Sequence, residues 1–394
     1  MGSSTTDSPR RWVRVGSSTL PDSQAALAQA LLGIAGPTQP KLVVLLASPH
    51  YDLAAVAAAL RDGLPDGTAV IGCTTSGEIA DAGSLRQSLV LWALGGEGIS
   101  VATGMGQGDG QGLRQAATQA AYCLERLPQR EHTVLLLLAD GLCGDQMDVV
   151  RGAYDVASLD VPLVGGCAGD DLAMKRTSQI LGDRVLTQAV VAAAISSEAP
   201  LGIGVSHGWK TASPPMLVTG SKGNVLASLD DRPALDVYLE FFDPPEPVRH
   251  DAAAFAAFAA CHPIGVRRRD KIEMRHVSGA DFLNRQLLTV AEVPQGGLAY
   301  LTEGDVDSVL EAAEESFKLA IGGLEGAPPV GLLLFDCVSR RSIFDASNLH
   351  EETDLIAATS GGVPMAGFYT YGEIARTKGA GGFHNQTLVT LAVS

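Results

Sequence analysis

The sequence has little positive charge and no long apolar run, and each shortage excludes a class of protein. Lysine and arginine total 28 against 44 aspartate and glutamate residues, so the formal net charge is -16. Proteins that bind nucleic acid or anionic lipid usually present a basic surface, so we expect neither partner. The apolar runs are far shorter than the roughly 20 residues that span a bilayer, so we expect no membrane-spanning helix.

The six cysteines stand apart from one another, and none has the CxxC spacing of a zinc or dithiol site. Unpaired thiols are typical of proteins in reducing compartments. Residues 1–16 are polar and lack the apolar core of a secretory signal. Together these features favour a cytoplasmic protein.

Familiar catalytic signatures are scarce as well. The sequence contains no H-E-x-x-H zinc motif and no Walker A loop. Cys73 and Cys167 have no neighbouring histidine or cation, which favours small buried side chains over nucleophiles. We therefore expect a protein that is not an enzyme, although catalytic residues distant in sequence can still meet in space.

One pattern occurs three times along the chain. Residues 41–48, 132–140 and 329–336 are apolar runs of strand length, and each is followed by a helical pattern, a glycine-rich turn and a second apolar run. The first and last copies share the turn G-x-x-x-x-G-E-I, which ends in Glu78-Ile79 and Glu373-Ile374. The middle copy is degenerate.

Apolar runs beside amphipathic helices indicate sheets covered by helices. We expect an α/β fold with mixed sheets, in two lobes built from pseudo-repeated strand-helix-strand units. Further helices are expected at 113–127 and 305–324, where apolar residues recur at helical spacing. Between about 200 and 300 the pattern indicates short strands with turns, and we place a boundary near 195–200.

A series of segments in this order resembles the signatures of paired FIST_N and FIST_C domains. They are LLASPHYD (45–52), VIGCTTSGEI (70–79), GGCAGDD (165–171), GVSHGWK (204–210), GNVLASLDDRPALDVY (223–238), GDVDSVLEAAEES (304–316), LLLFDCVSRR (332–341), AGFYTYGEI (366–374) and FHNQTLVTLAV (383–393). The resemblance places a FIST N-terminal domain at 11–197 and a FIST C-terminal domain at 198–394. Residues 335–341 depart from it, since the family commonly has Asn-Gly-Arg there.

The resemblance implies a cytoplasmic signal-transduction sensor that regulates a separate partner, such as a sensor histidine kinase or a cyclic-di-GMP enzyme. Freestanding members include the nitric-oxide-sensing haem proteins called NosP, so the resemblance also implies haem as a cofactor. The alternative is a haem-free sensor of a small polar metabolite, such as an amino acid derivative. Homo-oligomerisation is left open.

A haem site needs an axial ligand, which in gas-binding proteins is most often histidine. His207 stands beside Gly208 and Trp209; the glycine would let the backbone approach a macrocycle, and the indole could stack on it. We therefore expect His207 to bind the iron and Trp209 to contact the haem. The other interpretation of His207 is a partly buried histidine at a strand end.

A metabolite site would draw on the two repeated turns. Glu78 and Glu373 end glycine-bounded turns, where a carboxylate can meet a ligand closely. With Tyr369, His384 and Asn385 they are the expected ligand-binding residues, in a cleft between lobes. The structural alternative is that each glutamate pins its own turn. His50, which follows a strand, could reach a pocket at a strand end.

Overall fold

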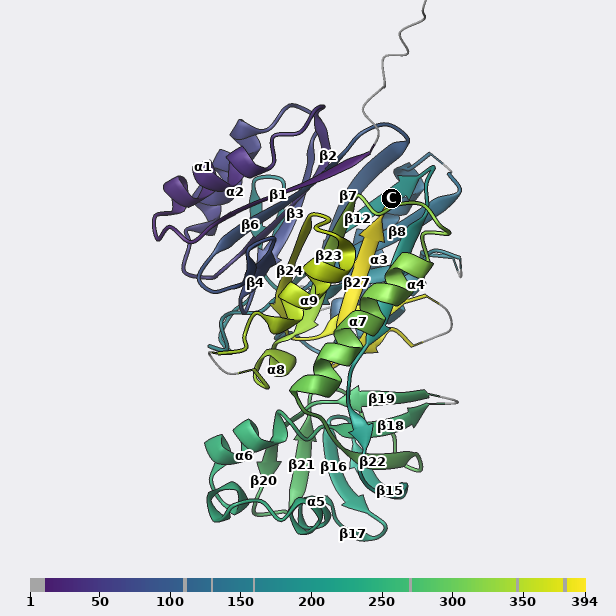
Figure 1. Ribbon diagram of the computed structural model, residues 1–394. Coiled ribbons are helices and arrows are strands. Elements are labelled where there is room, and N and C mark those ends of the chain that lie inside the picture. The colour runs from purple at the N-terminus through teal and green to yellow at the C-terminus, as the bar shows by residue number, and fades with distance from the viewer. Residues whose placement is uncertain are drawn as a thin grey trace, which may run out of the picture.

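The computed structural model describes residues 11–108, 112–128, 130–158, 160–268, 271–344, 347–377 and 381–394. Within these residues the chain forms three units of one topology and a domain inserted into the third (Figure 1). We call 12–95 unit 1, 99–197 unit 2, 201–206 with 306–393 unit 3, and 210–303 the inserted domain. The expected α/β class with mixed sheets and repeated units is confirmed.

Unit 1 alternates strands and helices, then adds a short hairpin and a closing strand. Its elements are β1 (Trp12–Ser18), α1 (Ser23–Gly33), β2 (Pro40–Ala47), α2 (Leu53–Gly63), β3 (Ala69–Thr74), β4 (Glu78–Ala80), β5 (Gly83–Leu85) and β6 (Leu89–Gly95). β2 pairs in parallel with β3 and antiparallel with β6, so its apolar run is buried on both faces. Asp52 caps α2 by accepting the N–H of Ala55.

Unit 2 repeats this order. Its elements are β7 (Ile99–Gln107), α3 (Gly112–Ala121), the 3₁₀ turn η1 (Tyr122–Arg126), β8 (His132–Ala139), α4 (Met147–Tyr154), β9 (Leu163–Cys167), β10 (Gln179–Leu181), β11 (Arg184–Leu186) and β12 (Ala189–Ser197). The helix expected over 113–127 therefore tightens into a 3₁₀ turn for its last residues.

Unit 3 has the same order, interrupted after its first strand. Its elements are β13 (Leu201–Ser206), α7 (Val306–Gly322), β23 (Gly331–Cys337), α8 (Val338–Arg341), α9 (Glu351–Ser360), β24 (Met365–Thr370), β25 (Glu373–Arg376), β26 (Phe383–His384) and β27 (Leu388–Val393). The expected boundary near 195–200 lies between β12 and β13, where unit 2 passes into unit 3. A capping box formed by Asp305 and Ser308 begins α7.

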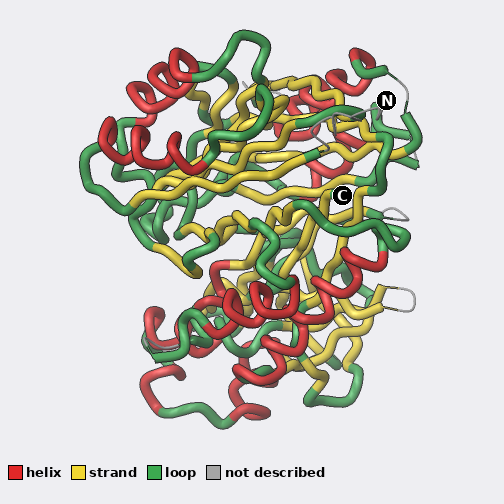
Figure 2. The backbone as a smooth tube through the Cα atoms, turned by 45° about the horizontal axis from the view of Figure 1, so that its top comes forward, coloured by secondary structure: helices red, strands yellow, loops and turns green. Residues whose placement is uncertain are grey.

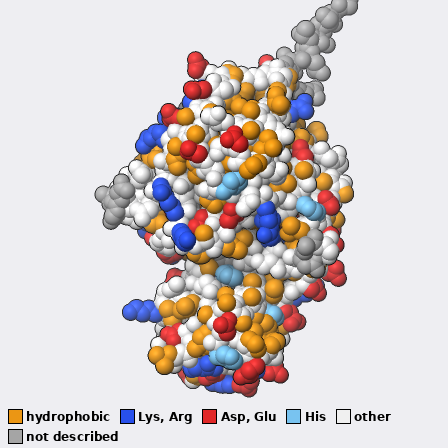
Figure 3. All heavy atoms as spheres, turned by 90° about the vertical axis from the view of Figure 1, so that its left-hand side faces the viewer, with side chains coloured by type: hydrophobic (Ala, Val, Ile, Leu, Met, Phe, Trp, Pro, Cys, Tyr) orange, Lys and Arg blue, Asp and Glu red, His pale blue; other side chains and the backbone are white. Residues whose placement is uncertain are grey.

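The inserted domain occupies the place between β13 and α7. Its elements are β14 (Lys210–Thr211), β15 (Met216–Lys222), β16 (Val225–Leu229), β17 (Arg232–Pro233), α5 (Ala234–Phe242), η2 (Glu246–Arg249), α6 (Ala252–Ala259), β18 (Ile264–Arg268), β19 (Lys271–Arg275), β20 (Val277–Asp281), β21 (Gln286–Thr289) and β22 (Leu298–Glu303). It forms its own sheet and core below the three units, and a constriction separates the two parts (Figure 3). Its strands match the expectation for 200–300, but the sequence analysis missed α5 and α6.

Each unit places its short hairpin in the sheet of another unit. The β4–β5 hairpin of unit 1 extends the sheet of unit 3, β10–β11 of unit 2 extends that of unit 1, and β25–β26 of unit 3 extends that of unit 2. The exchange is cyclic, so the sheet of every unit is completed by another unit. The repeated sequence pattern reveals the units but carries no information about pairing between them.

The three unit sheets share one central core. Trp92, Leu136 and Leu333, one from each unit, are fully buried in it. The outer face of each sheet is covered by helices: α1 and α2 on unit 1, α3 and α4 on unit 2, α7 and α9 on unit 3. Figure 2 shows the strands gathered between the helices. The carboxyl ends of the parallel pairs β2/β3, β8/β9 and β23/β24 are where connecting loops of neighbouring units meet.

Candidate ligand-binding site

Glu78 is fully buried at the first residue of β4. Its carboxylate accepts hydrogen bonds from Thr75 Oγ1 and from the N–H and Oγ of Ser88 (3.1 and 2.5 Å). Burial outweighs these donors and raises the pKa of Glu78 to about 7. Glu78 therefore ties its own turn to the residue that precedes β6.

Glu373 repeats this arrangement in unit 3. It is fully buried at the start of β25 and accepts from Thr370 Oγ1 (2.5 Å) and from the N–H and Oγ1 of Thr387 (3.2 and 2.8 Å). Burial raises its pKa to about 7 as well. Both carboxylates accept hydrogen bonds from residues of their own unit. This arrangement corresponds to the alternative given above, in which each glutamate holds its own turn.

The other expected ligand residues are buried too. Tyr369 is 2% exposed; its hydroxyl donates to Ser84 Oγ (2.9 Å), and the Arg341 guanidinium lies 4.4 Å from its ring centroid. His384 Nε2 lies 2.9 Å from a main-chain carbonyl oxygen of β25. Asn385 is 1% exposed, and its Oδ1 has no hydrogen-bond partner among the residues that the structure describes. None of these side chains lines the cavity described below.

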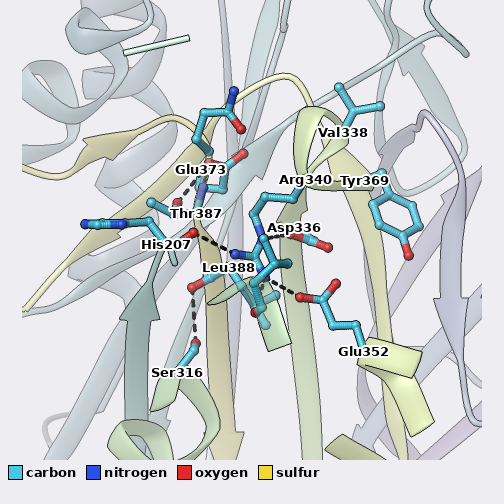
Figure 4. A network of polar contacts seen from close by, with 12 residues as sticks. His207, Ser316, Asp336, Val338, Arg340, Glu352, Tyr369, Glu373, Thr387 and Leu388 are labelled. Carbon is cyan, nitrogen blue, oxygen red and sulfur yellow. Dashed lines mark hydrogen bonds and ion pairs between the residues drawn. The ribbon is translucent and has the colours of Figure 1, made fainter. Parts of the chain in front are cut away.

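A buried cluster around Arg340 of α8 connects unit 3 to both chain crossings of the inserted domain (Figure 4). Arg340 Nε donates to Asp336 (2.8 Å), Nη1 to the His207 carbonyl oxygen (3.0 Å), and Nη2 to Glu352 and the Val309 carbonyl oxygen. Burial, and next the Glu352 charge, raise the pKa of Asp336. Because two carboxyl groups surround one guanidinium, the Asp336 carboxyl tends to keep its proton. The cluster holds unit 3 to the two segments that lead into and out of the inserted domain.

A cavity of about 530 Å³ opens at the carboxyl ends of β2 and β3 and is also lined by the loop 168–178, which joins β9 to β10 of unit 2. Its lining residues are Pro49, Tyr51, Asp52, Leu53, Thr74, Asp170, Ala173, Lys175, Arg176, Ser178 and Val185. The volume falls in the range of small-molecule sites, and ligands of α/β sheets commonly bind at strand carboxyl ends. Pro49 and Tyr51 flank His50, so the strand end noted in the sequence does border a cavity.

Asp170 fixes the shape of the loop that lines this cavity. It is 3% exposed and accepts the N–H groups of Met174 (2.9 Å), Lys175 (2.7 Å) and Arg176 (3.0 Å). It also accepts the hydroxyl of Tyr371 from unit 3 (2.5 Å). Burial opposes ionisation, but these donors prevail and hold the pKa of Asp170 below its ordinary value.

The same loop contacts the other two units. Asp171 accepts the Ser48 hydroxyl of unit 1 (2.7 Å), and the Leu172 N–H donates to the Tyr371 hydroxyl of unit 3 (2.9 Å). Asp171 and Leu172 both have positive φ (54° and 63°), a conformation that non-glycine residues adopt only when their surroundings hold them there. The loop therefore joins all three units beside the cavity, which we call the junction cavity.

Comparison with known families identifies this architecture. The FIST N domain matches residues 41–232, and the FIST C domain matches residues 234–376. The chain belongs to the FIST family. FIST domains are sensory modules of signal transduction, so the chain is a sensor in this broad sense. The two matches divide the chain inside the inserted domain, between β17 and α5, whereas the sequence placed the division at 197/198.

Relatives of this FIST protein extend over nearly its whole length. An uncharacterized protein of Mycobacterium tuberculosis is 27% identical over 403 residues, covering 95% of this chain and 97% of the relative. An uncharacterized protein of Mycobacterium bovis is 25% identical over 399 residues, covering 95% and 97% respectively. These relatives are therefore long enough to contain the same three units and inserted domain.

Haem, which the FIST resemblance implies, does not fit the residues around His207 as they lie here. Trp209 is 4% exposed and donates its indole N–H to the Gln386 carbonyl oxygen (2.9 Å), so its ring is packed inside the protein. A Cβ on Gly208 would lie 2.4 Å from the Ser308 carbonyl oxygen, so the glycine serves close packing against α7. Burial, and next the Arg340 charge, lower the pKa of His207 to about 4.

One motif in this FIST chain was overlooked in the sequence. Residues 204–208 read G-x-S-x-G, the spacing of a nucleophile elbow. In the structure Ser206 ends β13, its hydroxyl donates to Glu315 (2.6 Å), and the short strand β14 follows, not a helix. The His207 ring instead accepts the Trp209 N–H at Nδ1 (3.0 Å). The strand–turn–helix context that an elbow requires is missing from this segment.

Sequence reasoning also missed the cavity residues Lys175, Arg176 and Ser178. The glycine-rich segment GGCAGDD that precedes them was noted only as a family signature, and its two aspartates were the available signal of an ordered loop. Among the described residues no three histidine, cysteine, aspartate or glutamate side chains group as a metal site would require. Nor does any described helix have the length and apolarity to cross a bilayer.

Proposed function

We propose that this FIST protein is a non-enzymatic sensor of a small molecule, which binds in the junction cavity and alters the contact with a separate partner. The expected partner is a sensor histidine kinase or a cyclic-di-GMP enzyme. The observation that carries the proposal is the loop 168–178, which lines the cavity and is held by hydrogen bonds to units 1 and 3.

The position of the loop provides a physical route from ligand to output. A ligand changes a conformational equilibrium only when it binds one state better than another. A molecule bound against the loop contacts residues of units 1 and 2 directly, and Asp170 and Leu172 join that loop to Tyr371 of unit 3. Occupancy would therefore favour one relative arrangement of the three units.

Thermal unfolding with a panel of metabolites tests the proposal, because a ligand of the folded state raises the melting temperature. Ala173 is an exposed residue that lines the cavity, so Ala173→Trp should fill it without disturbing the core. The matched control is Ala28→Trp on the exposed side of α1. We expect stabilisation of the wild type and the control but not of Ala173→Trp; equal stabilisation of all three would refute the junction cavity.

The haem-based nitric oxide sensor is the second candidate, and it rests on one feature. His207 Nε2 makes no hydrogen bond to a described residue, so that nitrogen has no competing partner. Because Nδ1 accepts the Trp209 N–H, the neutral ring carries its proton on Nε2. Iron binding would therefore require that proton to leave Nε2, and it would require Trp209 to leave Gln386. A stoichiometric Soret band that shifts with nitric oxide, and that His207→Ala abolishes, would support this candidate. No band after haem reconstitution would remove it.

A further inference from the structure

We propose that the ligand of the junction cavity is a small acid, whose carboxylate or phosphate group binds between Lys175 and Arg176. The inference rests on the proposed function and names its ligand class. It differs in charge from a ligand of Glu78 and Glu373, because an ionised carboxylate would bind a cationic group.

The two acidic side chains at the cavity already have partners. Asp170 receives three main-chain N–H groups and the Tyr371 hydroxyl, which fills its acceptor positions. Asp52 caps α2 by accepting the Ala55 N–H (3.1 Å). Asp170 therefore cannot receive a cationic ligand group without losing a bond that shapes the site. Asp52 keeps one oxygen without a bond to a described residue, so Lys175 and Arg176 outnumber the one carboxylate at the cavity that could receive a cation.

The two cations have no such partners. The side chains of Lys175 and Arg176 make no hydrogen bond or ion pair to any residue in the described ranges, although both line the cavity. Both side chains are exposed, so an anionic ligand group can reach them without breaking an ion pair. Their main-chain N–H groups are fixed by Asp170, so both side chains start from an ordered backbone at the cavity edge.

The remaining lining supplies one polar group and an apolar wall. Ser178 is 6% exposed, and its hydroxyl has no bond to a described residue, so it can donate to an anion beside the two cations. Leu53, Val185 and Tyr51 supply apolar surface to the same lining. The site thus matches an acid that carries a small apolar body. Arg176 can hold either a carboxylate or a phosphate through two parallel N–H bonds.

The test compares matched probes at constant ionic strength by calorimetry and thermal unfolding. The probes are 4-methylpentanoate, its neutral amide 4-methylpentanamide, and inorganic phosphate. The proteins are the wild type, Lys175→Gln/Arg176→Gln, and the control Lys222→Gln/Arg268→Gln, which removes two exposed cations of the inserted domain. These four positions, like Ala173 and Ala28 above, are exposed, so the substitutions should not affect folding.

We expect an acid to bind the wild type and the control, and to bind Lys175→Gln/Arg176→Gln roughly 10-fold or more weakly, as for the loss of a charge-assisted hydrogen bond. Tighter binding of 4-methylpentanoate than of phosphate would identify the acidic group of the ligand as a carboxylate, and the opposite preference would identify it as a phosphate. Equal binding of the amide through a site that Ala173→Trp blocks would overturn the acid class and leave the proposed function standing. Equal binding of the acid to the cavity variant, or no binding of either acid to the wild type, would overturn the inference.

Discussion

Each unit joins its exchanged hairpin to its closing strand through one buried side chain, and the type of this side chain differs among the three units. At the first residue of the exchanged hairpin, units 1 and 3 have Glu78 and Glu373, while unit 2 has Gln179. Each of the three accepts the main-chain N–H of a residue where the closing strand starts: Ser88 and Thr387 directly precede β6 and β27, and the residue in unit 2 is the first of β12. In units 1 and 3 that residue also offers a hydroxyl, but in unit 2 it is Ala189, which has none.

We infer from this difference that the number of available hydrogen-bond donors determines whether the position carries a glutamate or a glutamine. A buried carboxylate needs several donors, whereas an amide supplies its own N–H groups and needs fewer. Gln179 donates to Thr177 Oγ1 (3.5 Å) and accepts from Ala189 (3.3 Å). The repeated glutamates are thus explained by architecture, and the proposed ligand site lies instead where one junction keeps an open cavity.

A second difference concerns the central strand of each unit. Asp336 of β23 occupies the position that Ala47 and Ala139 occupy in β2 and β8, because each pairs with the first or second residue of the closing strand in the same register. Only unit 3 carries an inserted domain, and only there is this position charged. Asp336 serves the Arg340 cluster, which holds both crossings to that domain.

The largest effect is expected from Arg340→Met, which makes unit 3 resemble the others while leaving its acids buried. Removing one partner of a buried ion cluster typically costs about 3–5 kcal/mol, because the remaining charges are uncompensated. Urea unfolding should show this loss in the free energy of unfolding. The control Asp336→Ala/Arg340→Met/Glu352→Gln should recover much of it; a single variant within about 1 kcal/mol of wild type would contradict the account.

The next effect is a pH dependence carried by the two glutamates. Their folded pKa is about 7 against an ordinary value of 4.5, so the folded state holds the proton more tightly. The contribution of these two glutamates to stability should therefore be greatest at acid pH and be lost as the pH rises from about 4.5 through about 7. Each pKa unit corresponds to about 1.4 kcal/mol, so Glu78→Gln should remove a fall on the order of 3 kcal/mol. Unfolding series from pH 5 to pH 8 measure it, and identical slopes in variant and wild type would refute it.

A smaller effect should follow from Gln179→Glu, which places a carboxylate in unit 2 where the closing strand offers no hydroxyl donor. The new carboxylate would receive the Ala189 N–H but no hydroxyl from that residue, leaving a buried acceptor short of a donor. We expect a cost of about 1–3 kcal/mol at pH 8, measured by chemical unfolding. Adding Ala189→Ser should restore part of it by supplying the hydroxyl seen at Ser88. If the serine gives no recovery, donor supply is not what separates the junctions.

The smallest effect on stability is expected from Tyr371→Phe. It removes the hydroxyl that joins Asp170 and the Leu172 N–H to unit 3. Three main-chain N–H groups still bind the buried Asp170 carboxylate, so we expect a loss of about 1 kcal/mol. The more informative readout is ligand response: the cavity should still bind its acid, while the change in partner activity should weaken. An unchanged partner response would show that the signal does not pass through Tyr371.

The repeat and its covering helices could be predicted because apolar periodicity follows directly from burial. The cyclic exchange of β4–β5, β10–β11 and β25–β26 could not, since a short strand pairs equally well in pattern with its own unit or another. Glu78 and Glu373 stand out in the sequence through the repeated turn, but their donors Ser88 and Thr387 lie 10 and 14 positions further along, beyond the turn motif. Lys175 and Arg176 were missed because a cation near a cavity has the same sequence appearance as one on any exposed loop.

The central claim is that an acid binds in the junction cavity and orders the loop that joins the three units. Hydrogen exchange measured by mass spectrometry, with and without a stabilising acid, tests it most directly. The account predicts slower exchange in residues 170–178, with a smaller slowing beside Ser48 and Tyr371. Slowing confined to the region of His207 and Trp209, or to the inserted domain, would place the ligand elsewhere and contradict the account.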